Sequence, residues 1–225
     1  MLARRLEGIP RARLEPVAVP DVDWVARFRA GFKPFAAGSF WIAPAWAASG
    51  APDGRGLLVV DPGRAFGTGT HETTRLCLRA VEALSPPPAS SARAIDVGTG
   101  TGILAIAAAR LGWRAPVAVD LDAEALDSAR SHAALNGASI ALVRADGGAA
   151  FASGAFDLVL ANLTAPLLLE RCHEIGRLAA PGAAIVLAGL LLEDVDSLVR
   201  RYASFGAVST EVDGEWASLV VRRAR

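Results

Sequence analysis

The sequence has little of several features that mark specialised protein classes. It contains two cysteines in 225 residues, and its 23 basic and 23 acidic residues give a formal net charge of zero. No window reaches the roughly 18 uninterrupted apolar residues of a membrane span, and no apolar run precedes the first prolines. Because the chain carries no net positive charge, nucleic-acid binding would need a local basic patch. We therefore expect a cytoplasmic protein with no membrane segment and no direct nucleic-acid partner.

The two cysteines and the N-terminal arginines add little further chemistry. Cys77 and Cys172 lie in helical patterns far apart in the sequence, without the spacing of metal ligands. They predict reduced, mostly buried thiols and no metal site. Four arginines between residues 4 and 13 can form either a solvated basic arm or a contact with a partner.

The pattern from Arg93 onward alternates short apolar runs with amphipathic segments. Runs bounded by Gly, Pro and Asp are typical of strands buried on both faces, and the alternation predicts an α/β fold. We expect a mostly parallel, Rossmann-like sheet with helices on both faces. The expected strands are 92–97, 116–120, 140–146, 156–163 and 184–190, and the expected helices are 102–112, 123–137, 167–180 and 193–205.

The last two strand-like runs differ from the others. Residues 207–212 and 216–221 are separated by Asp213-Gly214, which is a hairpin signal. The sheet is therefore expected to end in an antiparallel pair.

The segment before Arg93 has another character. An amphipathic helix is expected at 71–84, and Pro86 to Pro88 separate it from the first sheet strand. Aromatic residues concentrate between Trp24 and Trp46, and we expect them to pack as an extension against the main domain rather than to form a binding platform.

A glycine cluster marks the expected site. Gly98, Gly100 and Gly102 directly follow a predicted strand and open a predicted helix, where backbone N–H groups and the positive helix end can face a ligand. Asp120 ends the next strand, where a carboxylate can accept hydrogen bonds from both ribose hydroxyls of an adenosine. The alternative is a helix-packing turn followed by an unrelated aspartate.

The spacing within this cluster favours one cofactor over others. A dinucleotide loop reads G-x-G-x-x-G, whereas the third glycine here comes one residue early. Asp96, just before the first glycine, would repel a pyrophosphate but suits a ligand that carries an ammonium and a sulfonium. The loop also lacks the Gly-Lys-Ser/Thr ending of a triphosphate site. These features predict S-adenosylmethionine.

Two stretches resemble a known family. DVGTGTGIL at 96–104, with Asp120 and Asn162, resembles the class I S-adenosylmethionine-dependent methyltransferases. DPGRAFGTGTHETT at 61–74 is more specific, and is similar to the ribosomal protein L11 methyltransferases, which methylate lysine side chains and the N-terminal α-amine. The resemblance begins at about Asp23 and continues to the C-terminus.

The resemblance implies an organisation and a partner. It divides the chain into an N-terminal extension and connecting segment, residues 1–50, and a methyltransferase domain, residues 51–225. Family members carry an N-terminal recognition domain that we expect to be missing or vestigial here, because about 20 residues precede the connection. The partner is then a protein amine, in a ribosomal protein by resemblance, with weak or no methylation of L11. Alternatives are another protein or small-molecule substrate, or cofactor binding without catalysis.

Two residues are candidates for catalysis. Asn162, at the end of the fourth strand, can offer its amide oxygen to an amine N–H and aim the nitrogen lone pair. Its alternative is a turn residue at the end of a strand, and the stretch after it is one residue shorter than in the family. His71 can accept a proton from the amine, or it can make only local hydrogen bonds.

Three further residues are candidates for the cofactor site. Phe66 lies in a glycine-rich segment that can fold over the cofactor and shield its adenosine from water. Thr74, by resemblance, contacts the methionine end of the cofactor, and its alternative role is to cap a helical turn. Asp146 can accept a hydrogen bond from the adenine amino group, or it can belong to a turn. His132 and His173 lie in helical patterns and receive no role.

Overall fold

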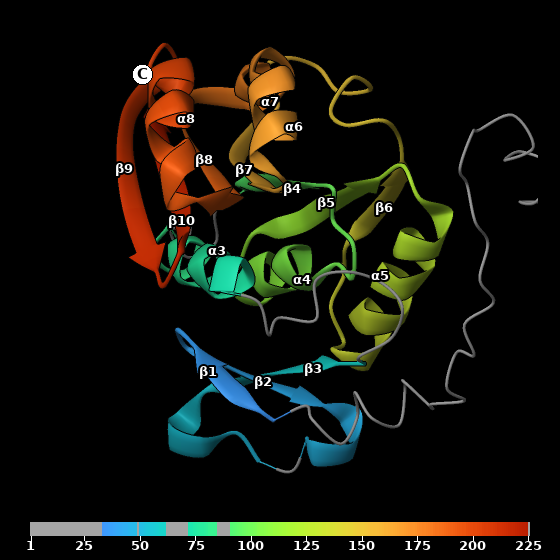
Figure 1. Cartoon of the computed structure of the whole chain (residues 1–225). Helices are drawn as coiled ribbons and strands as arrows, with labels where there is room; N and C mark the ends of the chain where they lie inside the picture. Colours follow the sequence, from blue (N-terminus) through green and yellow to red (C-terminus); the bar gives the residue numbers. More distant parts are fainter. Residues whose placement is uncertain (1–32, 49, 62–71, 85–90, 225) are drawn as a thin grey trace, which may run out of the picture. The chain divides into compact units, whose positions relative to one another are not determined.

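The computed structural model of the chain describes residues 33–48, 50–61, 72–84 and 91–224. They fall within one compact unit, Phe32–Arg225, which contains a three-stranded sheet and a seven-stranded sheet (Figure 1). Strands that precede residue 50 belong to this unit. The functional division at residue 50 stays a prediction.

The seven-stranded sheet has the order β6-β5-β4-β7-β8-β10-β9. Neighbours among β4 to β8 run parallel, and β10 lies antiparallel between β8 and β9. This arrangement confirms the mostly parallel sheet with an antiparallel C-terminal pair. The strands are β4 (Arg93–Val97), β5 (Arg114–Asp120), β6 (Ala141–Arg144), β7 (Phe156–Asn162), β8 (Ala179–Leu191), β9 (Gly206–Asp213) and β10 (Trp216–Arg223).

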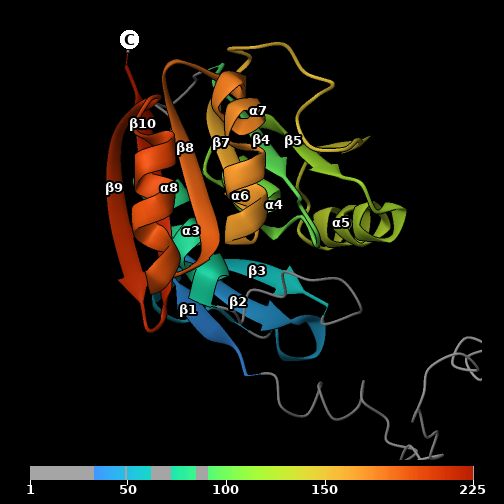
Figure 2. The ribbon, with the colours of Figure 1, turned by 45° about the horizontal axis from the view of Figure 1, so that its top comes forward.

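Helices cover both faces of this sheet, as expected. One face carries α3, α4 and α5, and the other carries α6, α7 and α8 (Figure 2). Their bounds are α3 (Glu72–Ala83), α4 (Ile103–Arg110), α5 (Ala123–Leu135), α6 (Ala165–Glu170), α7 (Cys172–Leu178) and α8 (Val195–Tyr202). No helix within residues 33–48, 50–61, 72–84 and 91–224 has both the length and the apolar character that a membrane crossing requires.

The helix expected at 167–180 differs from the structure. It consists of α6 and α7, with Arg171 between them, and its last two residues belong to β8. Ala179 pairs with Phe156 of β7, and the register then shifts before Leu158 pairs with Ala184. Residues 179 and 180 are alanines, which favour a helix by intrinsic propensity, and the pairing with β7 overrides that preference.

The three-stranded sheet was not predicted. It contains β1 (Phe35–Ala37), β2 (Phe40–Pro44) and β3 (Gly56–Val60), with β1 antiparallel and β3 parallel to β2. Short 3₁₀ turns are η1 (Ala45–Ala47), η2 (Pro52–Gly54) and η3 (Leu192–Asp194). Phe40 is 4% exposed, as a packing extension requires, whereas Trp46 is 47% exposed. Trp24, Phe28 and Phe32 lie outside the described residues.

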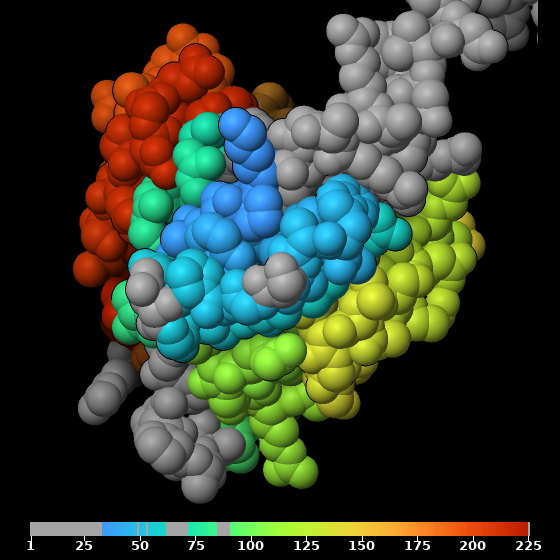
Figure 3. Space-filling model, turned by 90° about the horizontal axis from the view of Figure 1, so that it is seen from below, coloured from blue at the N-terminus to red at the C-terminus, as the bar shows by residue number. Residues whose placement is uncertain are grey.

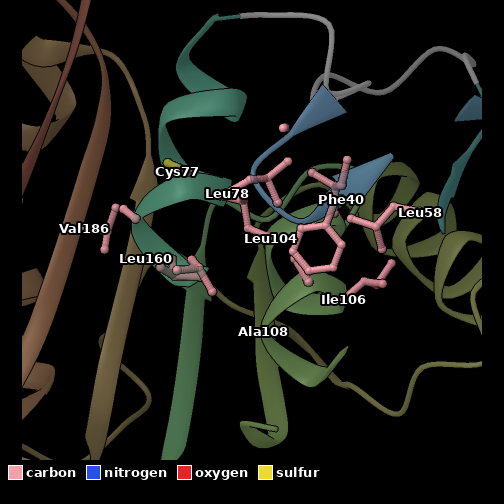
Figure 4. Packing of buried hydrophobic residues seen from close by; sticks show 14 of the residues in the cluster. Phe40, Leu58, Cys77, Leu78, Leu104, Ile106, Ala108, Leu160 and Val186 are labelled. Atoms are coloured by element: carbon pink, nitrogen blue, oxygen red, sulfur yellow. The ribbon is translucent and has the colours of Figure 1, made fainter. Parts of the chain in front are cut away.

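The small sheet shares a hydrophobic core with α3, α4 and the large sheet. Phe40 and Leu58 lie next to Leu104 and Ile106 of α4 (Figure 4). This packing holds β3 against the helix that begins at the glycine loop, so the small sheet contributes to the surroundings of that loop.

Both thiols are buried and free, which confirms the prediction of reduced, buried thiols. Cys77 belongs to the core under α3, and Cys172 belongs to the core under α6, α7 and α8. Burial raises the pKa of both thiols above the ordinary value of a cysteine. They are therefore poor candidates for a reactive thiolate.

Candidate active site

A cleft of about 770 Å³ lies where strands β4, β5 and β7 reach their carboxyl ends. Its volume is in the range of small-molecule sites, and this edge of a parallel sheet is where such sites form. The lining residues within the described ranges are Thr73, Thr74, Asp96, Gly98, Thr99, Gly100, Ile103, Leu104, Asp120, Asp122, Glu124, Ala125, Ser128, Asn162, Leu163, Thr164, Leu167, Gly189 and Trp216.

The glycine loop has a conformation that only glycine adopts easily. Gly98, Gly100 and Gly102 have φ angles of +72°, +53° and +79°. The backbone N–H groups of Gly98 and Thr99 both donate to the carbonyl oxygen of Val119, at 2.9 Å each. A Cβ on Gly98 would lie 2.5 Å from Cδ2 of Leu163. The loop is therefore fixed against β5 and leaves the cleft open.

Gly102 has a different task from the other two glycines. It precedes α4 and does not line the cleft, and a Cβ there would lie 2.9 Å from Cβ of Ala129 on α5. Gly102 therefore allows α5 to pack closely against the loop. The helix-packing interpretation holds for this glycine, and its predicted contact with a cofactor stays a prediction.

Asp120 is tied directly to the glycine loop. Its Oδ2 accepts a hydrogen bond from the Gly100 backbone N–H at 3.0 Å, and its Oδ1 accepts one from the Asp122 backbone N–H at 3.0 Å. An ionised carboxylate offers about four lone-pair positions. Two of these remain for a ligand that carries neighbouring hydroxyl groups, such as a ribose.

Asp96 is buried at the base of the cleft. Its Oδ2 accepts a hydrogen bond from Oγ1 of Thr99 at 2.6 Å. Burial raises the pKa of Asp96 to about 6, and the negative charge of Asp120 adds to this increase. Hydrogen bonds from the Thr99 hydroxyl and the Ala105 backbone oppose it. A positive charge that enters the cleft would lower this pKa and further favour the ionised form.

The charges that line the cleft all have one sign. Asp96, Asp120, Asp122 and Glu124 face it, and no lysine or arginine is found among its lining residues in the described ranges. Such a surface repels a pyrophosphate and attracts a cation. These acidic side chains therefore fit S-adenosylmethionine better than a dinucleotide.

Thr74 presents a buried polar atom to this cleft. Its side chain is fully buried on α3, and within the described residues Oγ1 has no hydrogen-bond partner. An unsatisfied buried hydroxyl costs about 1–3 kcal/mol. A polar group of a ligand in the cleft can recover this cost, and no hydrogen bond within the described part of the chain supports the capping role.

Asn162 lies at the end of β7 with its half-buried side chain on the cleft. Beside it, Gly189 of β8 has a φ of +89°, and a Cβ there would lie 2.2 Å from the Leu163 carbonyl oxygen. The same Cβ would lie 3.2 Å from Oδ1 of Asn162. Gly189 therefore makes room for the asparagine and the turn that follows it.

Besides Gly102, three predicted residues are not among the described residues that line this cleft. The Asp146 side chain is 62% exposed and pairs with the Arg171 guanidinium at 2.6 Å, and the residue does not line the cleft. Its contact with adenine stays a prediction. Phe66 and His71 lie outside the described residues.

Several lining residues were missed by sequence reasoning. Glu124, Ala125 and Ser128 of α5 form one wall, and Leu167 and Trp216 belong to the wall beside Asn162. A signal existed for Gly189, because a glycine inside an apolar strand pattern indicates close backbone approach. Trp216 carried none, because its place depends on β10 entering the sheet antiparallel beside β8.

The strand order, with one antiparallel strand inserted before the last, is that of the class I methyltransferase fold. A solved structure of this kind is the 16S rRNA N2 G1207 methyltransferase RsmC of Thermus thermophilus, in complex with AdoMet and guanosine. It superposes with a TM-score of 0.58 and 21% identity, over 71% of this chain and 45% of its own. At this identity the likeness supports the fold alone.

The family is also defined. The family model described as Ribosomal protein L11 methyltransferase (PrmA) matches residues 5–224, and the chain belongs to this family. The L11 methyltransferase of Geobacter sulfurreducens is 40% identical over 218 residues, which cover 96% of this chain and 71% of the relative. The crystal structure of the L11 methylase of Lactobacillus delbrueckii subsp. bulgaricus has a TM-score of 0.77 and 28% identity, over 86% of this chain and all of its own.

Proposed function

We propose that this chain transfers methyl groups from S-adenosylmethionine to amine nitrogens of a protein, with ribosomal protein L11 as the first substrate to test. Membership of the L11 methyltransferase family supports this reaction and this substrate. The observation that carries the proposal is that Asp120 and Asn162 line one acidic cleft. One residue suits the adenosine of a cofactor and the other suits an amine.

The cofactor is held by groups that the cleft already orients. The Asp120 carboxylate accepts hydrogen bonds from the ribose hydroxyls. Asp96 supplies negative charge near the glycine loop for the cationic end of the cofactor. The Thr74 hydroxyl, which has no partner among the described residues, donates a hydrogen bond to the cofactor or accepts one from it. When bound, S-adenosylmethionine supplies a methyl group on a positively charged sulfur.

The acceptor side of the cleft aligns the amine and keeps it neutral. An amine attacks only after it has lost its proton, and desolvation lowers the pKa of a lysine. Leu163, Leu167 and Trp216 supply the apolar wall that desolvates it. The Asn162 amide oxygen accepts one amine N–H and directs the lone pair, so catalysis there depends on alignment.

Mass spectrometry of purified L11 after incubation with the chain and S-adenosylmethionine tests the substrate. Family membership leads us to expect added methyl groups on lysine side chains or on the N-terminal amine, whereas the sequence predicts weak or no methylation of L11, and this measurement distinguishes the two. Asn162→Ala should bind the cofactor with nearly wild-type affinity while its turnover falls by about 100-fold or more, because it loses an aligning contact. If wild-type chain binds the cofactor but labels neither L11 nor any band of a cell extract, methyl transfer to proteins is wrong.

A further inference from the structure

One face of α5 lines the cleft in its first half and contacts β3 in its second half. Glu124, Ala125 and Ser128 line the cleft, and Ser128, His132 and Asn136 then follow at intervals of four residues. Residues four apart lie above one another on a helix, so these side chains form a continuous stripe. Its second half faces β3, which lies side by side with α5 (Figure 3).

Asn136 takes the place of a neighbouring strand at the open edge of β3. Its Oδ1 accepts from the Val59 N–H at 2.8 Å, and its Nδ2 donates to the Val59 carbonyl at 2.7 Å. The same Nδ2 donates to the His132 carbonyl at 2.8 Å. Since Asn136 is only 5% exposed, these bonds satisfy backbone groups where no paired strand is present among the described residues.

His132 continues the contact two residues further along the same edge. Its Nε2 lies 2.9 Å from the Asp61 backbone nitrogen, and its Nδ1 lies 2.8 Å from the Ser128 carbonyl oxygen. A backbone N–H can only donate, so Nε2 is the acceptor and Nδ1 carries the hydrogen. The buried imidazole thus links the end of β3 to the turn of α5 that lines the cleft.

We propose that His132 and Asn136 are positioning residues for the cofactor site, because they hold α5 between β3 and the glycine loop. This inference rests on the proposed function. The two residues touch neither the cleft nor a reacting atom. They act through α5, whose Ala129 packs against Gly102 and whose Ser128 lines the cleft.

A second element closes the same arrangement. Arg110, at the end of α4, donates from Nη2 to the Asn136 carbonyl at 2.7 Å. The helix that begins at the glycine loop, α4, is therefore also hydrogen-bonded to the end of α5. With β3 on one side and α4 on the other, α5 has little freedom to move away from the cleft.

Calorimetric titration with S-adenosylmethionine tests this role in three variants. His132→Phe keeps a ring but removes the acceptor, His132→Gln keeps an acceptor, and Asn136→Asp keeps the acceptor for Val59 while losing both donors. We expect His132→Phe and Asn136→Asp to raise the cofactor Kd about five- to tenfold, as the loss of one or two hydrogen bonds implies. His132→Gln should stay near wild type, and kcat at saturating cofactor should change by less than about twofold.

Tyr202→Phe is the matched control. It removes the bond from the Tyr202 hydroxyl to the Leu168 carbonyl at 2.8 Å, on the other face of the sheet. We expect it to lower thermal stability without changing cofactor affinity. Amide hydrogen exchange gives a second readout, because His132→Phe should accelerate exchange at Asp61 and Tyr202→Phe should not.

The outcomes separate the two proposals. Lower stability with unchanged cofactor Kd in both His132→Phe and Asn136→Asp would overturn the positioning role, as would equal loss of affinity in Tyr202→Phe. If His132→Phe does not fold, Asn136→Asp and His132→Gln decide the question. A wild-type chain that does not bind S-adenosylmethionine overturns the proposed function itself.

Discussion

The Gly100 backbone N–H donates to Oδ2 of Asp120 at 3.0 Å, which joins two residues that are 20 positions apart in the sequence. The bond fixes the carboxylate at the carboxyl end of β5 and steadies the centre of the glycine loop. A substitution at Asp120 therefore loosens the glycine loop and also removes the carboxylate that we propose for ribose binding.

We expect Asp120→Ala to raise the Kd for S-adenosylmethionine at least about tenfold, because each hydrogen bond to a charged acceptor contributes about 1.5–3 kcal/mol. Asp120→Asn should fall between alanine and wild type, since its amide oxygen can still accept the Gly100 N–H. Isothermal titration calorimetry measures both, with circular dichroism as the check on folding. Equal affinities in all three proteins would contradict a cofactor role for Asp120.

Thr74→Val should have opposite effects on stability and binding. Valine has nearly the shape of threonine and removes the buried Oγ1, which has no hydrogen-bond partner among the described residues. The cofactor-free domain should gain up to about 1–3 kcal/mol in its free energy of unfolding, while cofactor affinity falls. Chemical denaturation and titration measure the two quantities, and Thr74→Ser, which keeps the hydroxyl, should preserve affinity. Loss of stability in Thr74→Val would show that the hydroxyl already has a partner.

Cofactor affinity should depend on pH through Asp96. Its folded-state pKa of about 6 is above the ordinary aspartate value, so the charged form is the unfavourable one in the cofactor-free protein. The contribution of this group to stability is fully present below about pH 4 and is lost as pH rises through 6.

Binding should respond in the opposite direction, because a cationic ligand favours the ionised carboxylate. At about pH 5 only about a tenth of Asp96 is ionised, so the Kd for S-adenosylmethionine should be roughly tenfold higher than at about pH 7.5. Titrations across this range measure the slope, and Asp96→Asn should flatten it. A wild-type Kd that stays constant between these pH values would remove Asp96 from the binding step.

Gly189→Ala should cost more than an ordinary glycine substitution. Its φ of +89° strains any L side chain, and the added Cβ would meet the Leu163 carbonyl oxygen. We expect a loss of about 2 kcal/mol or more from the free energy of unfolding, together with reduced turnover through Asn162.

Gly214→Ala is the matched control for this substitution. Gly214 has a φ of +65° in the hairpin turn between β9 and β10, and a Cβ there would meet nothing within 4 Å. It should lose only the conformational cost of about 1–2 kcal/mol and keep its turnover. Denaturant unfolding compares the pair, and equal losses would show that the contact with Leu163 has no effect.

Sequence reasoning predicted residues that line the cleft wherever the local pattern and the chain topology agree. Asp96 lies near the end of β4, Gly98 and Gly100 follow it, and Asp120 and Asn162 end two other strands, so a parallel sheet brings them to a single edge. Thr74 also lines the cleft, although its position depends on how α3 packs on the sheet.

The contacts that sequence reasoning did not anticipate have tertiary causes. His132 looked like a helix-face residue, yet it is buried against β3, because the small sheet that covers it was not predicted. Asp146 lies two residues beyond β6, and the Arg171 guanidinium pairs with its carboxylate, so its contact with adenine stays a prediction. In both cases the partner is remote in the sequence and leaves no local pattern.

The burial of both native thiols gives each half of the core its own chemical reporter. Cys77 lies under α3, and Cys172 lies on the opposite side of the large sheet. A thiol reagent can reach either sulfur only after the surrounding layer opens, so the modification rate at each cysteine measures local opening. Equal rates at the two sites indicate that the domain unfolds as one cooperative unit, and unequal rates identify the layer that opens first. The same measurement with cofactor present reveals whether ligand binding protects one layer or both.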